Sequence, residues 1–497
     1  MCQGVSSMKR QPNHALGALL AETTWSNAGL AKRVNARCAA LGIPRSYTAT
    51  SVANWLSGMM PTEPVPRILA ELFTDGLHRR IGLRELGLPE DVAVDLGLAW
   101  GSTARATVDT VATLWRADME RRSLLLGSAW TASAFATPTR EWLLDWLDED
   151  TSHAGGRRVG QAEVEVIWSM SQTFADTDHR LGGGYARSTL VHYVNEIVLP
   201  LLDGTYPDRI GRLLMAAVAR LCDLGGFMAF DSGGGQQGFA QRYYIQALRL
   251  AQAAGDHALG AHILSDMAMQ AHYLRIGREA CSLARAGQRS ARASGSYSTL
   301  ARCCALEARA HALAGDGRRC GDAMTRAEQA LAKVRPEDEP FWIGFFTLEQ
   351  LHAEFAYAAA DLRRAADVQR FAPTVLATSE GMERRQVLVS AALASSYLPP
   401  GDQEKHDGSK VDVEEACAVL EKTVPLVRVL TTRRGVEAIN GARRRLKPNA
   451  VKLWADRCGQ EVDGDGCLVG ASVDAQAFVG VSGQRSFDGS GFDAEPA

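Results

Sequence analysis

The sequence predicts an all-α protein that contains an internal helical repeat. Apolar residues recur at spacings of three and four, the period of amphipathic helices, and not at the spacing of two that strands show. Alanine is abundant and runs of β-branched residues are short. Five segments of similar pattern follow one another in the second half of the chain, and such repetition is typical of stacked helix pairs.

An opening block over residues 9–88 is predicted to be a compact helical domain. Its expected helices span 13–22, 26–41, 50–57 and 65–79, with a short one near 83–87. The helix over 50–57 has an apolar side made of Val52, Trp55 and Leu56. Its other side carries small polar residues: Thr50, Ser51, Asn54 and Ser57. Small hydroxyl and amide side chains on a short helix suit the base edges of a DNA major groove.

Basic residues gather in this opening block, although the chain as a whole has a formal net charge of -3. Residues 26–58 contain no Asp or Glu. Four cations lie there: Lys32, Arg33, Arg37 and Arg45. Basic clusters neutralise DNA phosphates. A DNA-reading surface and the solvated face of an ordinary helical domain both agree with this distribution.

A helical connecting region is expected over residues 89–205. Amphipathic helices are predicted at 106–125 and 139–150, and the second places Trp142 and Trp146 on one side, as core residues do. Residues 152–158 are expected to form a flexible link. Three consecutive glycines at 182–184 predict a break between two helices.

Helical repeats are predicted over residues 206–450. Similar segments lie at 237–256, 276–295, 316–335, 361–380 and 412–431. Each has a small residue near its start: Ala240, Ala280, Cys320, Ala365 and Ala416. Other helices precede them, for example over 258–277 and 298–317. Small residues let paired helices approach closely, and stacked pairs form a curved solenoid.

These helix pairs resemble the tetratricopeptide family, with a longer repeat than its usual ~34 residues. The resemblance implies a tetratricopeptide-like α-solenoid after the opening domain. Residues 459–497 are rich in Gly, Ser and Asp and show no period, so a disordered C-terminal tail is expected.

The opening block resembles the lambda-repressor-like (Cro/C1, XRE-type) helix-turn-helix family. The resemblance lies in Leu-Ala at 30–31, Val-x-x-Trp at 52–55 and Gly-x-x-Pro at 58–61. It implies base-edge contacts from Thr50, Ser51 and Asn54, and backbone contacts from Ser26 and Asn27. It also implies phosphate contacts from Lys32, Arg33, Arg37 and Arg45. The stretch from 31 to 52 is several residues longer than the family's spacing, so either the helix or the turn must be extended.

Residues 9 to about 450 also resemble large actinobacterial regulators that join such a domain to a tetratricopeptide-like region. The segments that carry this resemblance are 114–125, 182–194 and 238–256. Those regulators are associated with differentiation and secondary metabolism. The resemblance implies a transcription regulator that binds double-stranded DNA. A homodimer is expected because two half-sites multiply a weak affinity.

The sequence contains no motif of a known catalytic site, so no enzyme activity, cofactor or metal is expected. GxSxG, GxxxxGK[ST] and HExxH are all absent. His192 with Glu196, and His262 with Asp266, lie four apart on helices, but two ligands do not make a metal site. The ten cysteines form no CxxC and are interpreted as structural thiols.

The repeats are the expected place for an effector, which could be a peptide, a protein or a small molecule. Candidate contacts on the concave face are Tyr243, Tyr244, Tyr273 and Arg275. Residues 223–239, which are rich in glycine and include Asp231, are predicted to form a wide inter-helix turn, with a ligand-lining loop as the alternative.

A cytoplasmic location and no membrane partner are expected. The N-terminus lacks the apolar core of a signal peptide, and the longest apolar candidate, around 191–202, is interrupted by polar residues. Two functions remain open from sequence: a DNA-binding regulator that senses an effector or dimerises, and a repeat scaffold whose N-terminal module does not bind DNA.

Overall fold

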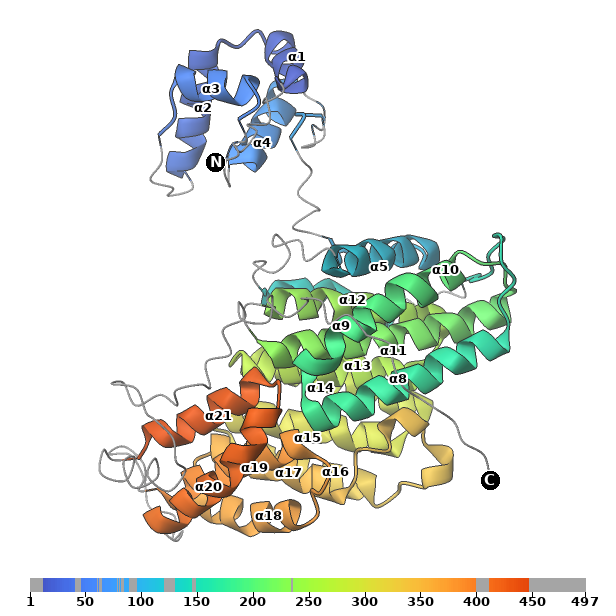
Figure 1. Cartoon of the computed structure of the whole chain (residues 1–497), viewed down its shortest axis with the longest axis vertical. Coiled ribbons are helices and arrows are strands. Elements are labelled where there is room, and N and C mark those ends of the chain that lie inside the picture. The colour runs from blue at the N-terminus through green and yellow to red at the C-terminus, as the bar shows by residue number, and fades with distance from the viewer. Residues whose placement is uncertain are drawn as a thin grey trace, which may run out of the picture. The chain divides into compact units, whose positions relative to one another are not determined.

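The computed structural model is all-α and divides into two compact units, residues 1–96 and 97–497 (Figure 1). The structure describes residues 12–40, 46–59, 61, 65–77, 79, 81, 85–88, 96–119, 130–144, 149–233, 236–398 and 411–446. The predicted tail, most of the loop at 399–412 and Arg45 lie outside these residues. The predicted segments 89–205 and 206–450 both contribute to the second unit.

The first unit contains four described helices around one apolar core. These are α1 (His14–Glu22), α2 (Asn27–Ala40), α3 (Ala49–Leu56) and α4 (Val65–Leu77), close to the predicted spans. Leu16, Leu30, Val52 and Phe73 are among the side chains that the core buries completely. Residues 85–87 form a turn, so the helix expected near 83–87 is wrong over that part.

Side-chain caps determine where the first two helices begin. Asn13 accepts a hydrogen bond from the Leu16 N–H at 2.9 Å and also donates to the Leu86 carbonyl at 2.9 Å. The hydroxyl of Ser26 accepts from the Gly29 N–H at 3.1 Å at the start of α2. Both caps satisfy N–H groups that the helix itself leaves without acceptors.

The second unit begins with α5 (Ala104–Met119), followed by a 3₁₀ turn (Ala132–Phe135) and α7 (Ala136–Leu144). Trp142 on α7 is completely buried, as the predicted stripe required, while Trp146 lies outside the described residues. Residues 149–150 are not helical, so the helix predicted over 139–150 ends earlier than expected.

Further helical segments follow α7 in the second unit. They are α8 (Gln161–Leu181), α9 (Gly183–Tyr193), a π-helical turn (Val194–Val198), α10 (Leu199–Leu202) and α11 (Asp208–Ser232). Gly182 separates α8 from α9 with a φ of 83°, a conformation that favours glycine. The expected flexible link at 152–158 is instead anchored, because its His153 exchanges two backbone hydrogen bonds with Tyr206.

Helix α11 is long and apolar enough to cross a membrane by length and composition. However, 89% of its most apolar window is buried by the rest of the protein, which is the environment of a core helix. The prediction of a wide inter-helix turn over residues 223–239 is wrong over most of that range. Residues up to Ser232 continue α11, and Asp231 is a fully buried ion-pair partner.

Consecutive helices from α11 onward pack as pairs, which gives a helical-repeat solenoid (Figure 1). They are α12 (Gln237–Ala254), α13 (His257–Tyr273), α14 (Gly277–Ser294), α15 (Tyr297–Leu313), α16 (Gly317–Leu331), α17 (Leu348–Asp361), α18 (Ala365–Ala377), α19 (Glu383–Tyr397), α20 (Val413–Val429) and α21 (Arg433–Arg444). The pairs are α11 with α12, α13 with α14, α15 with α16, α17 with α18, and α19 with α20.

Four of the five small residues predicted at the paired faces are buried: Ala240, Ala280, Cys320 and Ala416. Ala365 differs, because it is the first residue of α18 and is only half-buried. The contact with the neighbouring helices is made one turn later, where Val368 and Ala372 enter the core.

Candidate functional site

The outer side of α3 is the first candidate site. Val52 and Trp55 of α3 are buried, and Tyr47 packs its ring 5.4 Å from that of Trp55. Because these contacts fix the helix on its apolar side, its opposite side faces solvent. We call this exposed side the α3 face; it consists of Ala49, Thr50, Ala53 and Asn54.

Two of the three predicted base-contacting residues lie on the α3 face, and the third has a structural contact. Thr50 and Asn54 are exposed. Ser51 is half-buried, and its hydroxyl accepts a hydrogen bond from the Thr48 N–H at 3.1 Å. That bond helps to begin α3, so Ser51 combines a capping contact with its predicted role.

The connection between α2 and α3 is long, and Asn35 holds its second end. Helix α2 extends to Ala40, and α3 begins at Ala49. The Asn35 side chain donates to the Tyr47 carbonyl at 2.8 Å and accepts from the Tyr47 N–H at 2.7 Å. The stretch between Ala31 and Val52 was expected to be longer than the helix-turn-helix spacing. Its residues lie partly in α2 and partly in the connection that follows it.

The side chains predicted to contact phosphates differ in their own interactions within the protein. Lys32 is exposed. The Arg33 guanidinium lies 4.4 Å from the centre of the Trp25 ring and donates to the Gly29 carbonyl at 3.2 Å. Arg37 pairs with Glu71 at 2.8 Å, with side chains 45% and 50% exposed, so a competing phosphate displaces only a weak surface pair.

The predicted backbone contacts lie at the start of α2. Ser26 is exposed and caps the helix through its hydroxyl, and Asn27 is its half-buried first residue. The first N–H groups of a helix favour an anion at such a position.

A cavity of about 640 Å³ inside the second unit is the second candidate site. Its walls come from α8 and from every second helix of the repeats, namely α11, α13, α15, α17, α19 and α21. All of these repeat helices except α21 are the first helices of their pairs, so the cavity occupies one side of the solenoid. The volume falls within the range of roughly 300–1,000 Å³ typical of small-molecule sites.

One wall of the cavity carries a buried cluster centred on His262. Arg302 donates to Asp266 at 2.5 Å and to the His262 Nδ1 at 2.6 Å. Arg220 donates to Asp223 at 2.6 Å and lies 3.0 Å from the His262 Nε2. Burial and the positive charge of Arg302 hold the pKa of His262 well below its usual value.

Another wall carries a second buried cluster, which joins α8 and α11 to α19 and α21. Arg384 donates to Asp178 at 2.6 Å and lies 3.5 Å from Asp231. Asp231 also pairs with Arg434 at 2.7 Å. Both guanidiniums lie against the Phe227 ring, at 4.8 Å and 5.3 Å from its centre. The cluster ties the last helices of the unit to its first ones.

A third group lies where α13, α15 and α17 meet. Arg309 donates to Glu354 at 2.9 Å and lies over the Tyr357 ring at 5.0 Å. His272 lies 2.8 Å from Asp361. Burial and the neighbouring Arg309 lower the pKa of His272, despite the opposing carboxylate of Asp361.

Of the four residues predicted for the concave face, two lie in the core and two line the cavity. Tyr243 and Tyr244 are completely buried in the core. Tyr273 and Arg275 do line the cavity, where Tyr273 hydrogen-bonds to Glu437 and Arg275 lies 3.4 Å from Asp361. Sequence reasoning missed the arginines and carboxylates of the other walls, because their partners are far apart in the chain.

Two groups of potential metal ligands occur within the described residues, and neither favours a cation. Asp223, His262 and Asp266 form one, but Oδ2 of Asp223 accepts from Arg220 and Asp266 accepts from Arg302. A metal ion there would meet two positive charges and would have to displace both arginines. The exposed pair His192 and Glu196, considered from sequence, belongs to neither group.

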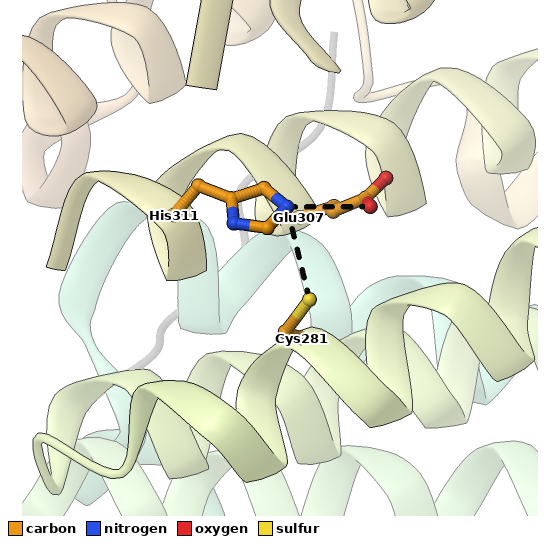
Figure 2. Close-up of side chains that lie close together, drawn as sticks. All are labelled: Cys281, Glu307 and His311. Carbon is orange, nitrogen blue, oxygen red and sulfur yellow. Dashed lines mark hydrogen bonds and ion pairs between the residues drawn. The ribbon is translucent and has the colours of Figure 1, made fainter. Parts of the chain in front are cut away.

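The second group is Cys281, Glu307 and His311, drawn in Figure 2. The His311 Nε2 lies 3.9 Å from the Cys281 sulfur and 3.5 Å from Glu307, so one nitrogen faces both partners. A catalytic triad instead uses both ring nitrogens. Burial raises the pKa of Cys281, which disfavours the reactive thiolate.

Glu307 is committed to other partners besides His311. It accepts hydrogen bonds at 2.7 Å from each of Arg285, Gln288 and Arg326. These donors outweigh the effect of burial and bring the pKa of Glu307 to about 2. The cluster therefore resembles a structural ion-pair network that joins α14, α15 and α16, with no ligand position left for a metal.

Comparison with known proteins gives a match within the first unit. A family model described as the SP15 N-terminal domain matches residues 16–89. The match begins within α1, includes α2 to α4 and does not reach the second unit. No curated protein and no solved structure matches the chain.

Proposed function

We propose that this protein is a transcription regulator that binds double-stranded DNA through the α3 face. The observation that carries the proposal is the composition of that face. Ala49, Thr50, Ala53 and Asn54 are small and exposed, so the helix backbone can approach base edges closely. Asn54 supplies both a donor and an acceptor, the combination that suits adenine.

The charge around the α3 face supports this proposal. Residues 26–58 carry cations and no carboxylate, and Lys32 and Arg33 are both exposed on α2. Stacking on Trp25 restricts the Arg33 side chain, so less conformational entropy is lost when it meets a phosphate. We further propose that the protein acts in the cytoplasm as a homodimer, since a single small module reads few base pairs.

The cavity of the second unit supports a sensory role for the repeats, and we assign it binding and no catalysis. Its buried carboxylates are paired with arginines, and its histidines have lowered pKa values caused first by burial. Such groups are poor general acids or bases near neutral pH. The alternative function is a repeat scaffold that does not bind DNA, which the engagement of Arg37 by Glu71 favours.

Duplex binding by the full-length chain tests the proposal. Asn54→Ala is expected to weaken binding to a selected duplex about tenfold, because a bidentate base contact is worth ~1–3 kcal/mol. Arg33→Ala should weaken binding to all sequences alike and reduce its salt dependence. His14→Ala, an exposed change on α1, is the control. Equal binding by all three variants and the parent would contradict the role of the α3 face, and no binding by the parent would favour the scaffold.

A further inference from the structure

Arg385 differs from the arginines that form the cavity clusters, because no carboxylate pairs with it in the described part of the chain. It lines the cavity from α19, next to the paired Arg384. Its Nε donates to the Ser379 hydroxyl at 3.0 Å, and its NH1 lies 3.5 Å from Oε1 of the Gln350 side chain. Both partners are neutral, and they orient the guanidinium without compensating its charge.

Arg385 is half-buried, and its surroundings disfavour the charged form. Burial lowers its pKa, and the nearby Tyr357 and Glu349 only partly oppose this effect. A half-buried guanidinium has lost part of its hydration, and an anionic group at its open side would replace the interactions that burial has removed. Its NH2 group has no acceptor among the described residues, so part of the planar fork remains available to a ligand.

His179 lines the same cavity and lies in an arginine-rich environment. It lies on α8, half-buried, with its ring 5.3 Å from that of Phe345. Burial and four arginines (Arg384, Arg220, Arg302 and Arg385) bring its pKa to about 3. Four guanidiniums thus act on this part of the cavity, and three of them are paired with carboxylates.

Apolar side chains lie beside this positive wall. Phe345, Tyr357, Met382 and Leu388 line the cavity and are only partly buried, so their remaining surface is open to an occupant. A pocket that combines an apolar lining with one oriented guanidinium suits a molecule with an apolar body and a single anionic group.

We infer that the cavity binds an amphipathic small anion, an aromatic or aliphatic molecule whose carboxylate, phosphate or sulfonate pairs with Arg385. This inference rests on the proposed function in one respect: it gives the chemical class of the effector that the repeats are proposed to sense. Because binding to the cavity is measured without DNA, a failure of DNA binding leaves the inference standing, and a failure here leaves the DNA-binding proposal standing.

The test uses a matched pair of fluorescent probes on the full-length chain. 8-Anilinonaphthalene-1-sulfonate carries an anionic group, and N-phenyl-1-naphthylamine has the same rings without it. The sulfonate is expected to bind at one site about tenfold more tightly than the neutral amine, since a charge-assisted hydrogen bond is worth ~1.5–3 kcal/mol. Equal affinities, or no binding of the sulfonate, would overturn the inference.

Variants locate the site. Arg385→Gln should weaken sulfonate binding about tenfold and leave amine binding unchanged. Arg385→Lys retains the charge and is used if the first variant unfolds. Its affinity for the sulfonate should lie between those of the parent and Arg385→Gln, because lysine lacks the planar fork of donors. Arg318→Gln, on the exposed side of α16 and away from the cavity, should change neither. Sulfonate binding that is the same in the Arg385 and Arg318 variants refutes the assignment.

Competition separates the possible anionic groups. Benzoate and phenyl phosphate are titrated against the bound sulfonate, with benzamide as the neutral control. Displacement by benzoate alone indicates a carboxylate ligand, and stronger displacement by phenyl phosphate indicates a phosphate. Displacement by benzamide as strong as that by both anions would contradict a charge-selective site.

Discussion

Arg384 of α19 donates a hydrogen bond to Asp178 of α8 at 2.6 Å, across 206 positions of the sequence. Both side chains are nearly inaccessible, at 9% and 2% exposure. Asp231 of α11 accepts from the Gly183 N–H at 3.1 Å and from the Thr432 hydroxyl at 3.0 Å, so the same cluster also fixes α9 and α21. The shape of the cavity thus depends on one buried network that connects the two ends of the second unit.

Arg384→Ala should strongly destabilise the second unit. The substitution leaves Asp178 and part of Asp231 without a counter-charge in the interior, which costs about 3–5 kcal/mol for a buried pair. Thermal unfolding followed by circular dichroism measures the effect. Arg319→Ala is the matched control, because the Arg319 side chain is 68% exposed and its pairing with Asp316 is a surface contact. A similar melting temperature in both variants would contradict the proposed importance of the network.

Gly260→Ala should destabilise the packing of α7 on α13. A Cβ at this position would lie 1.9 Å from the Trp142 ring, and Trp142 is completely buried. The ring is also held by a hydrogen bond to the Ser290 hydroxyl at 2.6 Å, so it cannot move freely. We expect a loss of about 3 kcal/mol or more in the free energy of unfolding.

Gly321→Ala is the control for that substitution. Gly321 lies within α16, and nothing approaches its added Cβ within 4 Å. Alanine should therefore stabilise the protein by up to about 1 kcal/mol, through helix propensity alone. Denaturant unfolding of the two variants should give effects of opposite sign, and a neutral Gly260→Ala would show that the contact is not rigid.

The Glu307 network should make stability depend on acid pH. The pKa of Glu307 falls from its ordinary 4.5 to about 2 in the folded state, where Gln288, Arg285 and Arg326 outweigh burial. The unfolded chain therefore binds the proton first, so the stabilisation is complete above pH 4.5 and is lost as the pH falls toward 2.

Glu307→Gln removes this dependence. The difference in unfolding free energy between parent and variant should be constant above pH 4.5 and shrink as the pH falls toward 2. Glu328→Gln, an exposed change on α16, serves as the control in the same titration. A pH-independent difference for the Glu307 variant would contradict the role of the network.

Asn35→Ala should destabilise the first unit without touching the α3 face. It removes two hydrogen bonds to the Tyr47 backbone, at 2.8 Å and 2.7 Å, with an expected cost of about 1–2 kcal/mol. Thr50→Ala, on the α3 face, should change stability by less than about 0.5 kcal/mol and yet weaken DNA binding. If calorimetry finds the first unit unchanged by Asn35→Ala, the long connection is held by other contacts.

Local signals explain why most helices could be predicted. Asn13, Ser26 and Asp316 cap α1, α2 and α16, and such caps are local because they need only residues within the next turn. Val52 and Trp55 likewise follow from the period of the helix itself. Helix 223–232 was missed because paired glycines normally favour turns, whereas here Gly225 and Gly226 make room for Trp115 and Tyr244.

The cavity could not be predicted, since its chemistry depends on contacts distant in sequence. Arg384 and Arg385 are adjacent and of the same type, but only the first meets carboxylates, from α8 and α11. Tyr243 and Tyr244 were expected on the concave face, yet both enter the core, while Tyr273 reaches the cavity. Ser26, Lys32, Thr50 and Asn54 are exposed, whereas the half-burial of Asn27, the capping contact of Ser51 and the pairing of Arg37 depended on the structure.

Binding of the full-length protein to genomic DNA fragments of its source organism, at increasing salt, tests the central claim most directly. The account predicts that a small set of fragments is enriched and that log affinity falls linearly with log salt, with a slope of about −3 to −4 for each module if the four predicted cations contact phosphates. Asn54→Ala should abolish the enrichment of specific fragments while leaving the salt slope. No enrichment and no salt-dependent binding by the parent protein would contradict the account and favour the scaffold.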